Sequence, residues 1–199
     1  MGIKSRGSSS QEKEKKMIYQ LPLQVTGLAA GVLLLASHAF GLFNPSASIR
    51  LARDFPRSRL MGTVLLLIAT IWSFLLVQDI DLGEFSRLRG IMLIGIVAGA
   101  ALSWIYVDEF LSVRALGMIL LLAAEPLLES SALRVEPSRL ILVVLAYAWV
   151  VAGLFFVGMP YVLRDAVGAI SSDRRVWFSA ALGGFLYGTA LIFAALFWW

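Results

Sequence analysis

The chain has 199 residues, of which 59% are hydrophobic and only 15% are charged. Soluble domains carry roughly 25% charged and 45–50% apolar residues, so this composition excludes an ordinary soluble protein. The absence of cysteine excludes disulfides, thiolate metal sites and cysteine nucleophiles. The net charge of +4 comes from basic residues that flank the apolar runs, a pattern that suits anionic lipid headgroups better than nucleic acid.

The N-terminal segment is polar and low in complexity, so it cannot bury enough apolar surface to fold. We expect a disordered basic tail over residues 1–16 and a transmembrane helical domain over residues 17–199. The segment up to Ala39 also resembles a secretory signal peptide. Its apolar region is long for that purpose and contains Gln20 and Gln24, so we expect an uncleaved first span.

The remaining sequence contains six apolar segments of the length that crosses a bilayer core of about 30 Å as a helix. They are too uniformly apolar for barrel strands, and backbone groups in hydrocarbon need the internal bonds of a helix. The predicted spans are Leu21–Phe43, Leu60–Val77, Leu88–Val107, a fourth within Phe110–Leu133, Leu140–Leu163 and Val176–Trp199. The predicted fold is therefore all-α, a polytopic bundle of about six transmembrane helices.

Three of these spans carry glycines four residues apart, a spacing that lets helices approach closely inside a membrane. The small-residue ridges are Gly27 and Gly31, then Gly95 and Gly99 extended by Ser103, then Gly184 and Gly188. Contacts within the chain are the first expectation for each ridge. A homodimer or another membrane subunit is the alternative.

The connector between the first two spans, residues 44–59, is the most basic one. A short helix from Ser48 that ends at Pro56 would align several arginines in the membrane interface, where they bind lipid phosphates. The candidate headgroup residues are Arg50, Arg53, Arg57 and Arg59. An ordinary charged loop is the alternative.

The topology is not decided by the sequence. With six spans both termini lie on one side, and the connectors place nine basic residues on that side and eight on the other. The positive-inside rule therefore gives no orientation, although the five basic residues of the tail favour a cytoplasmic N-terminus.

The fourth span holds the carboxylates Glu125 and Glu129 beside Pro126. A span from Arg114 to Arg134 would put Glu125 at the midplane, where an ionisable group indicates a proton or cation site. A span over Phe110–Leu128 would put Glu125 in the last turn, and we favour this second placement because an arginine near a helix end can snorkel. The transport candidates are Glu125, Glu129 and Arg114.

The other polar residues give weaker indications. His38 is the only histidine, so a haem or metal site would lack its second ligand, and we expect no cofactor, no metal and no catalytic set. Acidic clusters lie at two span ends, where we expect ion pairs with neighbouring arginines. Their members are Asp79, Asp81 and Glu84, and then Asp108 and Glu109.

Three functions fit these observations. The favoured one is a non-catalytic, multi-pass protein of the bacterial cytoplasmic (inner) membrane. Its partners are membrane lipids and other membrane subunits or itself, and it acts by helix packing as a subunit or assembly component of a larger complex. The first alternative is a small proton- or cation-linked transporter that uses Glu125 and Glu129. The second is a lipid-handling enzyme that uses the acidic clusters.

Overall fold

The computed structural model describes residues 21–106, 110–132 and 136–199, and the regular elements in these ranges are helices. The long helices are α1 (Leu23–Phe43), α3 (Arg59–Asp79), α4 (Arg89–Tyr106), α5 (Leu111–Ser131), α6 (Arg139–Gly158) and α8 (Arg174–Phe197). Two short helices, α2 (Pro45–Asp54) and α7 (Tyr161–Ile170), and two 3₁₀ segments, η1 (Phe55–Arg57) and η2 (Gly83–Leu88), lie in the connectors. The predicted N-terminal tail, Asp108, Glu109 and Arg134 lie outside the described residues.

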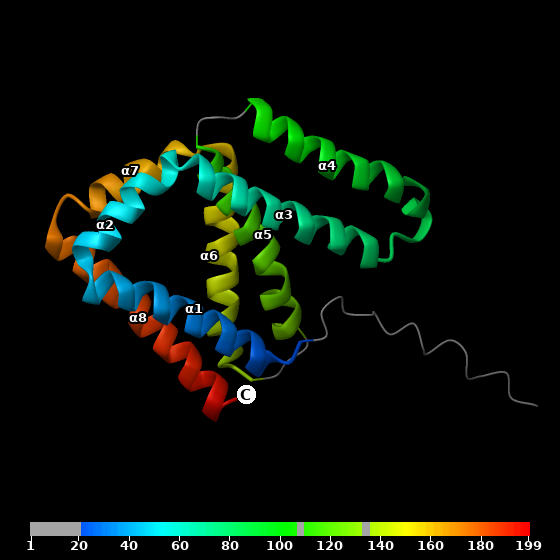
Figure 1. Ribbon diagram of the computed structural model, residues 1–199. Coiled ribbons are helices and arrows are strands. Elements are labelled where there is room, and N and C mark those ends of the chain that lie inside the picture. The colour runs from blue at the N-terminus through cyan, green and yellow to red at the C-terminus, as the bar shows by residue number, and fades with distance from the viewer. Residues whose placement is uncertain (1–20, 107–109, 133–135) are drawn as a thin grey trace, which may run out of the picture.

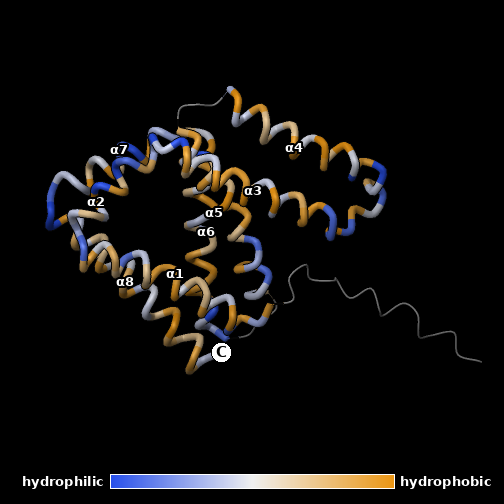
Figure 2. The backbone as a smooth tube through the Cα atoms, viewed as in Figure 1, coloured by the Kyte–Doolittle hydropathy of each residue, from blue (hydrophilic) through white to orange (hydrophobic). Residues whose placement is uncertain are grey.

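Six helices of the described ranges are long and apolar enough to cross a membrane. Large apolar side chains remain exposed along them, among them Leu67 at 57%, Ile94 at 71% and Phe193 at 50%. Apolar residues predominate along the long helices, whereas polar residues gather at the connectors (Figure 2). A surface of this kind is stable against lipid and would aggregate in water. The predicted all-α fold is confirmed, and the chain is a multi-pass integral membrane protein.

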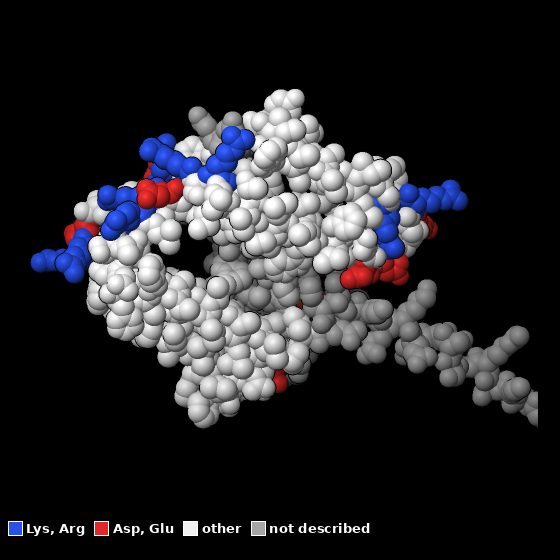
Figure 3. All heavy atoms as spheres, in the orientation of Figure 1, with Lys and Arg blue, Asp and Glu red and all other residues white. Residues whose placement is uncertain are grey.

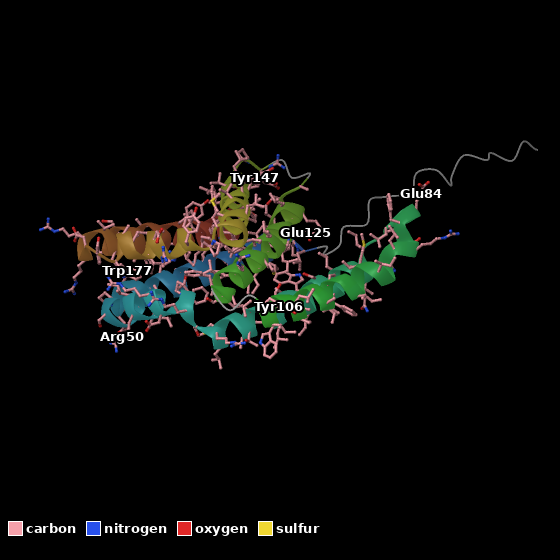
Figure 4. All side chains as sticks on the ribbon, turned by 90° about the horizontal axis from the view of Figure 1, so that it is seen from above. Arg50, Glu84, Tyr106, Glu125, Tyr147 and Trp177 are labelled. Carbon is pink, nitrogen blue, oxygen red and sulfur yellow. The ribbon has the colours of Figure 1, made fainter. Side chains whose placement is uncertain are left out.

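The long helices form three antiparallel pairs: α1 with α8, α5 with α6, and α3 with α4. The α5–α6 pair occupies the middle, because α5 contacts both α1 and α3 (Figure 1). The view from above shows the same order, with α8 and α1 at one end of the row and α3 and α4 at the other (Figure 4). The helix α4 therefore lies at the edge of the molecule.

The main core lies where α1, α5, α6 and α8 meet. It includes Leu142 and Leu191, both 0% exposed, with Ala146 packed between the helices. Short polar bonds add to it: the hydroxyl oxygens of Thr26 and Ser130 are 2.8 Å apart and join α1 to α5. Because lipid tails compete equally well for apolar side chains, close packing and such hydrogen bonds hold these helices together.

Two span boundaries differ from the sequence prediction by three residues or more. The fifth span, predicted as Leu140–Leu163, ends at Gly158, and a separate helix α7 starts at Tyr161. Pro160 lies between them; its ring nitrogen has no hydrogen to continue the ladder, while its fixed φ suits the start of a helix. The fourth span starts at Leu111, as the favoured placement requires, but continues past Leu128 to Ser131.

The short helices α2 and α7 lie side by side at one end of the molecule and run across the ends of α1 and α8 (Figure 1). The predicted arginine helix is α2, which begins at Pro45 rather than at Ser48. Its partner α7 was not predicted, since its apolar residues were assigned to the fifth span.

Candidate functional site

The ridges of α1 and α8 lie against each other. A Cβ on Gly31 would lie 2.8 Å from Cγ1 of Ile192 and 3.1 Å from the carbonyl oxygen of Gly188. A Cβ on Gly27 would collide with the ring of Trp199. The backbones thus approach directly at Gly31 and Gly188, and the other glycines make room for side chains of the facing helix, which is the contact for which small-residue ridges are suited.

His38 belongs to the same α1–α8 contact. Its ring lies directly over Gly184, where a Cβ would overlap it. Its Nδ1 is 2.8 Å from the carbonyl oxygen of Leu34 and 3.2 Å from the Ser37 hydroxyl. The histidine is therefore held in a helix interface, and Gly184 provides the space that its ring occupies.

A second close approach, between α5 and α6, was missed from the sequence. A Cβ on Gly117 would lie 2.8 Å from the carbonyl oxygen of Gly153, and a Cβ on Gly153 equally close to that of Gly117. Neither glycine has a partner four residues away, so neither forms a ridge. The available signal was the isolated glycine inside a long apolar helix, which usually has a packing reason.

The two glycines of the third ridge, on α4, face open space among the residues that the structure describes. A Cβ on Gly95 or on Gly99 would meet nothing within 4 Å. No residue of α4 is buried, and Ser103 at the end of the ridge is half-buried. The structure thus brings the ridges of α1 and α8 together and leaves the ridge of α4 open.

The open ridge faces a groove between α3, α4 and α5 with a volume of ≈ 420 Å³. We call it the α4 groove. Its wall on α3 includes Leu66, Thr70 and Ser73, and its wall on α5 includes Met118 and Leu122. The lining is mostly apolar, with the hydroxyls of Thr70, Ser73 and Ser103 as its polar groups.

The carboxylates of the fourth span lie on the same side of α5 as the groove. Met118, Leu122, Glu125 and Glu129 follow one another at helical spacing, so they form one stripe. Glu125 is half-buried and lies six residues before the end of the helix, about 9 Å along its axis. It is therefore neither at the centre of the span nor in its last turn, and Figure 4 shows it in the middle of the row of helices.

Arg114 is not part of that carboxylate site. It lies in the first turn of α5, eleven residues before Glu125, which is about 17 Å along the helix. The structure therefore separates the three transport candidates into Glu125 with Glu129 near one end of α5 and Arg114 at the other. The Nε atom of Arg114 is buried and has no hydrogen-bond partner among the described residues.

The predicted headgroup arginines lie at the end formed by α2 and α7, where basic side chains gather (Figure 3). Arg53 donates from Nε to the Ser171 hydroxyl at 2.8 Å and from Nη2 to the Ser171 carbonyl oxygen at 3.0 Å, so it links α2 to the end of α7. Arg59 lies over the ring of Trp104 at 5.8 Å. All four arginines of the group are exposed.

The acidic cluster at the α3–α4 connector is held by backbone bonds. Asp81 accepts a hydrogen bond from the Gly83 N–H at 3.0 Å, and Arg89 donates to the Ile80 carbonyl oxygen at 2.7 Å. The expected pairing of arginine with carboxylates is replaced here by bonds that close the turn. Within the described ranges, no group of three or more His, Asp and Glu side chains is placed to hold a metal ion.

Comparison of the chain with known protein families, with curated proteins and with solved structures gives no match.

Proposed function

We propose that the protein is a non-catalytic membrane subunit that binds a transmembrane helix of another membrane protein through the α4 groove. The observation that carries this proposal is the open ridge. Of three ridges with the same spacing, two lie in the α1–α8 contact, whereas a Cβ on Gly95 or Gly99 would meet nothing within 4 Å in the part of the chain that the structure describes.

The physical argument is that glycine lowers the stability of a helix, and that this loss is offset where the glycine allows another helix to pack closely. A glycine in a helix interior is about 1 kcal/mol less favourable than alanine. In α1 and α8 that cost is offset by close backbone approach, but the glycines of α4 gain no such contact from the described residues. A helix from a second protein would provide it, with the hydroxyls of Ser73 and Ser103 available for bonds between the helices.

The test is purification in mild detergent from native membranes, with mass measurement of the assembly, for wild type and for Gly95→Leu with Gly99→Leu. A Cβ at either position would meet nothing within 4 Å among the described residues, so we expect leucine there to fill part of the groove, to keep the fold and to exclude the partner. The matched control is Gly90→Leu on the same helix. Gly90 lies nine residues before Gly99, which is two and a half helical turns, so it faces the opposite side of α4. A Cβ on Gly90 would also meet nothing within 4 Å among the described residues.

The proposal requires that wild type and Gly90→Leu purify with a second polypeptide at fixed stoichiometry and that the double variant purifies without it. A wild-type protein that purifies without any second polypeptide would overturn it. A partner retained in the double variant would also overturn the assignment to α4.

The expected location is the bacterial cytoplasmic membrane. Support comes from the fold class, since outer-membrane proteins are typically closed β-barrels and the spans here are helices. Fractionation of inner and outer membranes followed by immunodetection tests this expectation.

The second candidate function is proton- or cation-linked transport. It is favoured by the stripe on α5 that runs from the groove lining at Met118 and Leu122 to Glu125 and Glu129. Pro126, which is buried, also leaves the Leu122 carbonyl without its usual N–H donor, next to the carboxylate. A dye for internal pH in proteoliposomes tests this function. Transport requires a wild-type flux that Glu125→Gln abolishes and that Glu136→Gln, a change in the exposed connector, leaves intact.

A further inference from the structure

We propose that a hollow between α2, η1 and α7 binds the phosphate of an anionic phospholipid headgroup. We call it the arginine hollow; its volume is ≈ 290 Å³. The residues that matter for binding are Arg53, Asp54, Arg57, Arg164 and Gly168. This site is separate from the α4 groove, and it uses α7, which sequence analysis did not predict.

Two of the three arginines of the hollow are held in place by neighbouring residues. Arg53 is fixed by its two bonds to Ser171, which is 8% exposed, and these bonds leave further N–H donors on the guanidinium. Arg164 donates from Nε to Asp165 at 2.8 Å and lies over the ring of Phe110 at 5.7 Å. Preorganised guanidinium groups lose less freedom when they bind, and their planar forks match phosphate oxygens.

The charge of the hollow favours an anion. Three arginines and one aspartate line it, which gives 3 − 1 = +2, and the nearby carboxylate of Asp165 reduces this to +1. Arg57 completes the set from the end of η1, and its guanidinium is bonded to none of the residues that the structure describes. Gly168 borders open space, since a Cβ there would meet nothing within 4 Å among the described residues.

The position of the hollow favours a lipid over a soluble phosphate. Short amphipathic helices that cross the ends of membrane spans lie at headgroup level, with apolar residues toward the acyl chains. The connectors and helix ends at this side carry eight arginines and three aspartates, 8 − 3 = +5 over the described residues. Those residues are Arg50, Arg53, Arg57, Arg59, Arg114, Arg164, Arg174 and Arg175 with Asp54, Asp165 and Asp173.

Asp54 favours a headgroup that carries hydroxyl groups beside its phosphate. A carboxylate beside a bound phosphate repels it, but the same carboxylate accepts hydrogen bonds from hydroxyl groups. A headgroup that joins a phosphate to a polyol, such as that of phosphatidylglycerol, satisfies both the arginines and Asp54. The volume of the hollow equals the liquid share of roughly ten water molecules, so it has room for such a group.

The experiment measures lipid binding to the purified full chain by native mass spectrometry during titration with phosphatidylglycerol. The test variants are Arg57→Gln alone and Arg57→Gln with Arg164→Gln. Arg53 is left intact because it links α2 to α7. The matched control is Arg174→Gln with Arg175→Gln, which removes the same charge from the same end of the molecule but outside the hollow.

We expect the apparent affinity for phosphatidylglycerol to fall about 30-fold in the double hollow variant and about fivefold in Arg57→Gln, with little change in the control. Equal losses in the hollow and control pairs would overturn the proposal, because general surface charge would then explain binding. Phosphatidylcholine that binds as tightly, or inorganic phosphate that displaces the lipid at millimolar concentration, would also overturn it.

Discussion

Replacing Gly188 by alanine tests the α1–α8 contact where the two backbones approach most closely. A Cβ there would lie 2.8 Å from the backbone nitrogen of Leu35 and 2.9 Å from the carbonyl oxygen of Gly31. Both atoms belong to the backbone of α1, so no side chain can rotate away. Ordinary contact begins at 3.4 Å, and the two helices would have to separate by about 3.4 − 2.8 = 0.6 Å.

A gap of that size removes a quarter to a half of the dispersion attraction across the interface. Overpacking of this kind costs about 1–3 kcal/mol. Alanine also improves helix propensity by up to about 1 kcal/mol, which would hide part of the loss. The matched control Gly183→Ala removes this problem, since it makes the same change in the same helix where a Cβ meets nothing within 4 Å.

The assay is equilibrium unfolding in mixed micelles with increasing dodecyl sulfate, followed by far-ultraviolet circular dichroism. Gly188→Ala should be less stable than Gly183→Ala by about 1–3 kcal/mol. If the two variants unfold at the same detergent fraction, α1 and α8 do not approach as closely as described, and the explanation of their ridges is wrong.

Three further predictions follow from the packing and from the connectors. Thr26→Val and Ser130→Ala should show a coupling of about 0.6 kcal/mol in a double-mutant cycle, because their hydroxyls are 2.8 Å apart; zero coupling would mean that the bond does not form. Leu142→Ala should destabilise the protein by about 2–5 kcal/mol, while Leu67→Ala, at a lipid-exposed position, should cost much less; equal losses would contradict the core assignment. The chain has no native cysteine, so an introduced cysteine is the only site that a thiol reagent can label. Ser46→Cys and Ser172→Cys should react with an impermeant reagent from one side of the membrane and Ser86→Cys from the other. Labelling of all three from one side would contradict the six-span arrangement.

The fold class could be predicted from the sequence because length and hydropathy determine it directly. A helix that crosses the bilayer needs about 20 apolar residues, and this requirement appears in the composition of each segment. The boundary at Pro160 was harder, since the apolar residues on both sides of the proline read as one span. The stereochemistry of proline was the available signal, and giving it more weight would have separated α6 from α7.

Partner choice could not be predicted from the ridges. Their spacing indicates where a helix can be approached closely but not which helix approaches it, and three equivalent ridges allow several pairings. The separation of Arg114 from Glu125, by contrast, could have been predicted from helical spacing alone. Eleven residues place two side chains on one face of a helix but three turns apart. Gly117 and Gly153 carry no repeat at all, so only the three-dimensional arrangement reveals their contact.

Photocrosslinking from the α4 groove, with a photoreactive amino acid at Ser103 in native membranes, tests most directly whether that groove holds another protein. The control position is Ile71, which is 59% exposed on α3 and does not line the groove. We predict a discrete crosslinked product from position 103, heavier than the 21.8 kDa chain, that contains a second polypeptide, and no such product from position 71. Crosslinks to lipid alone from both positions would contradict the proposed docking of a partner helix on α4.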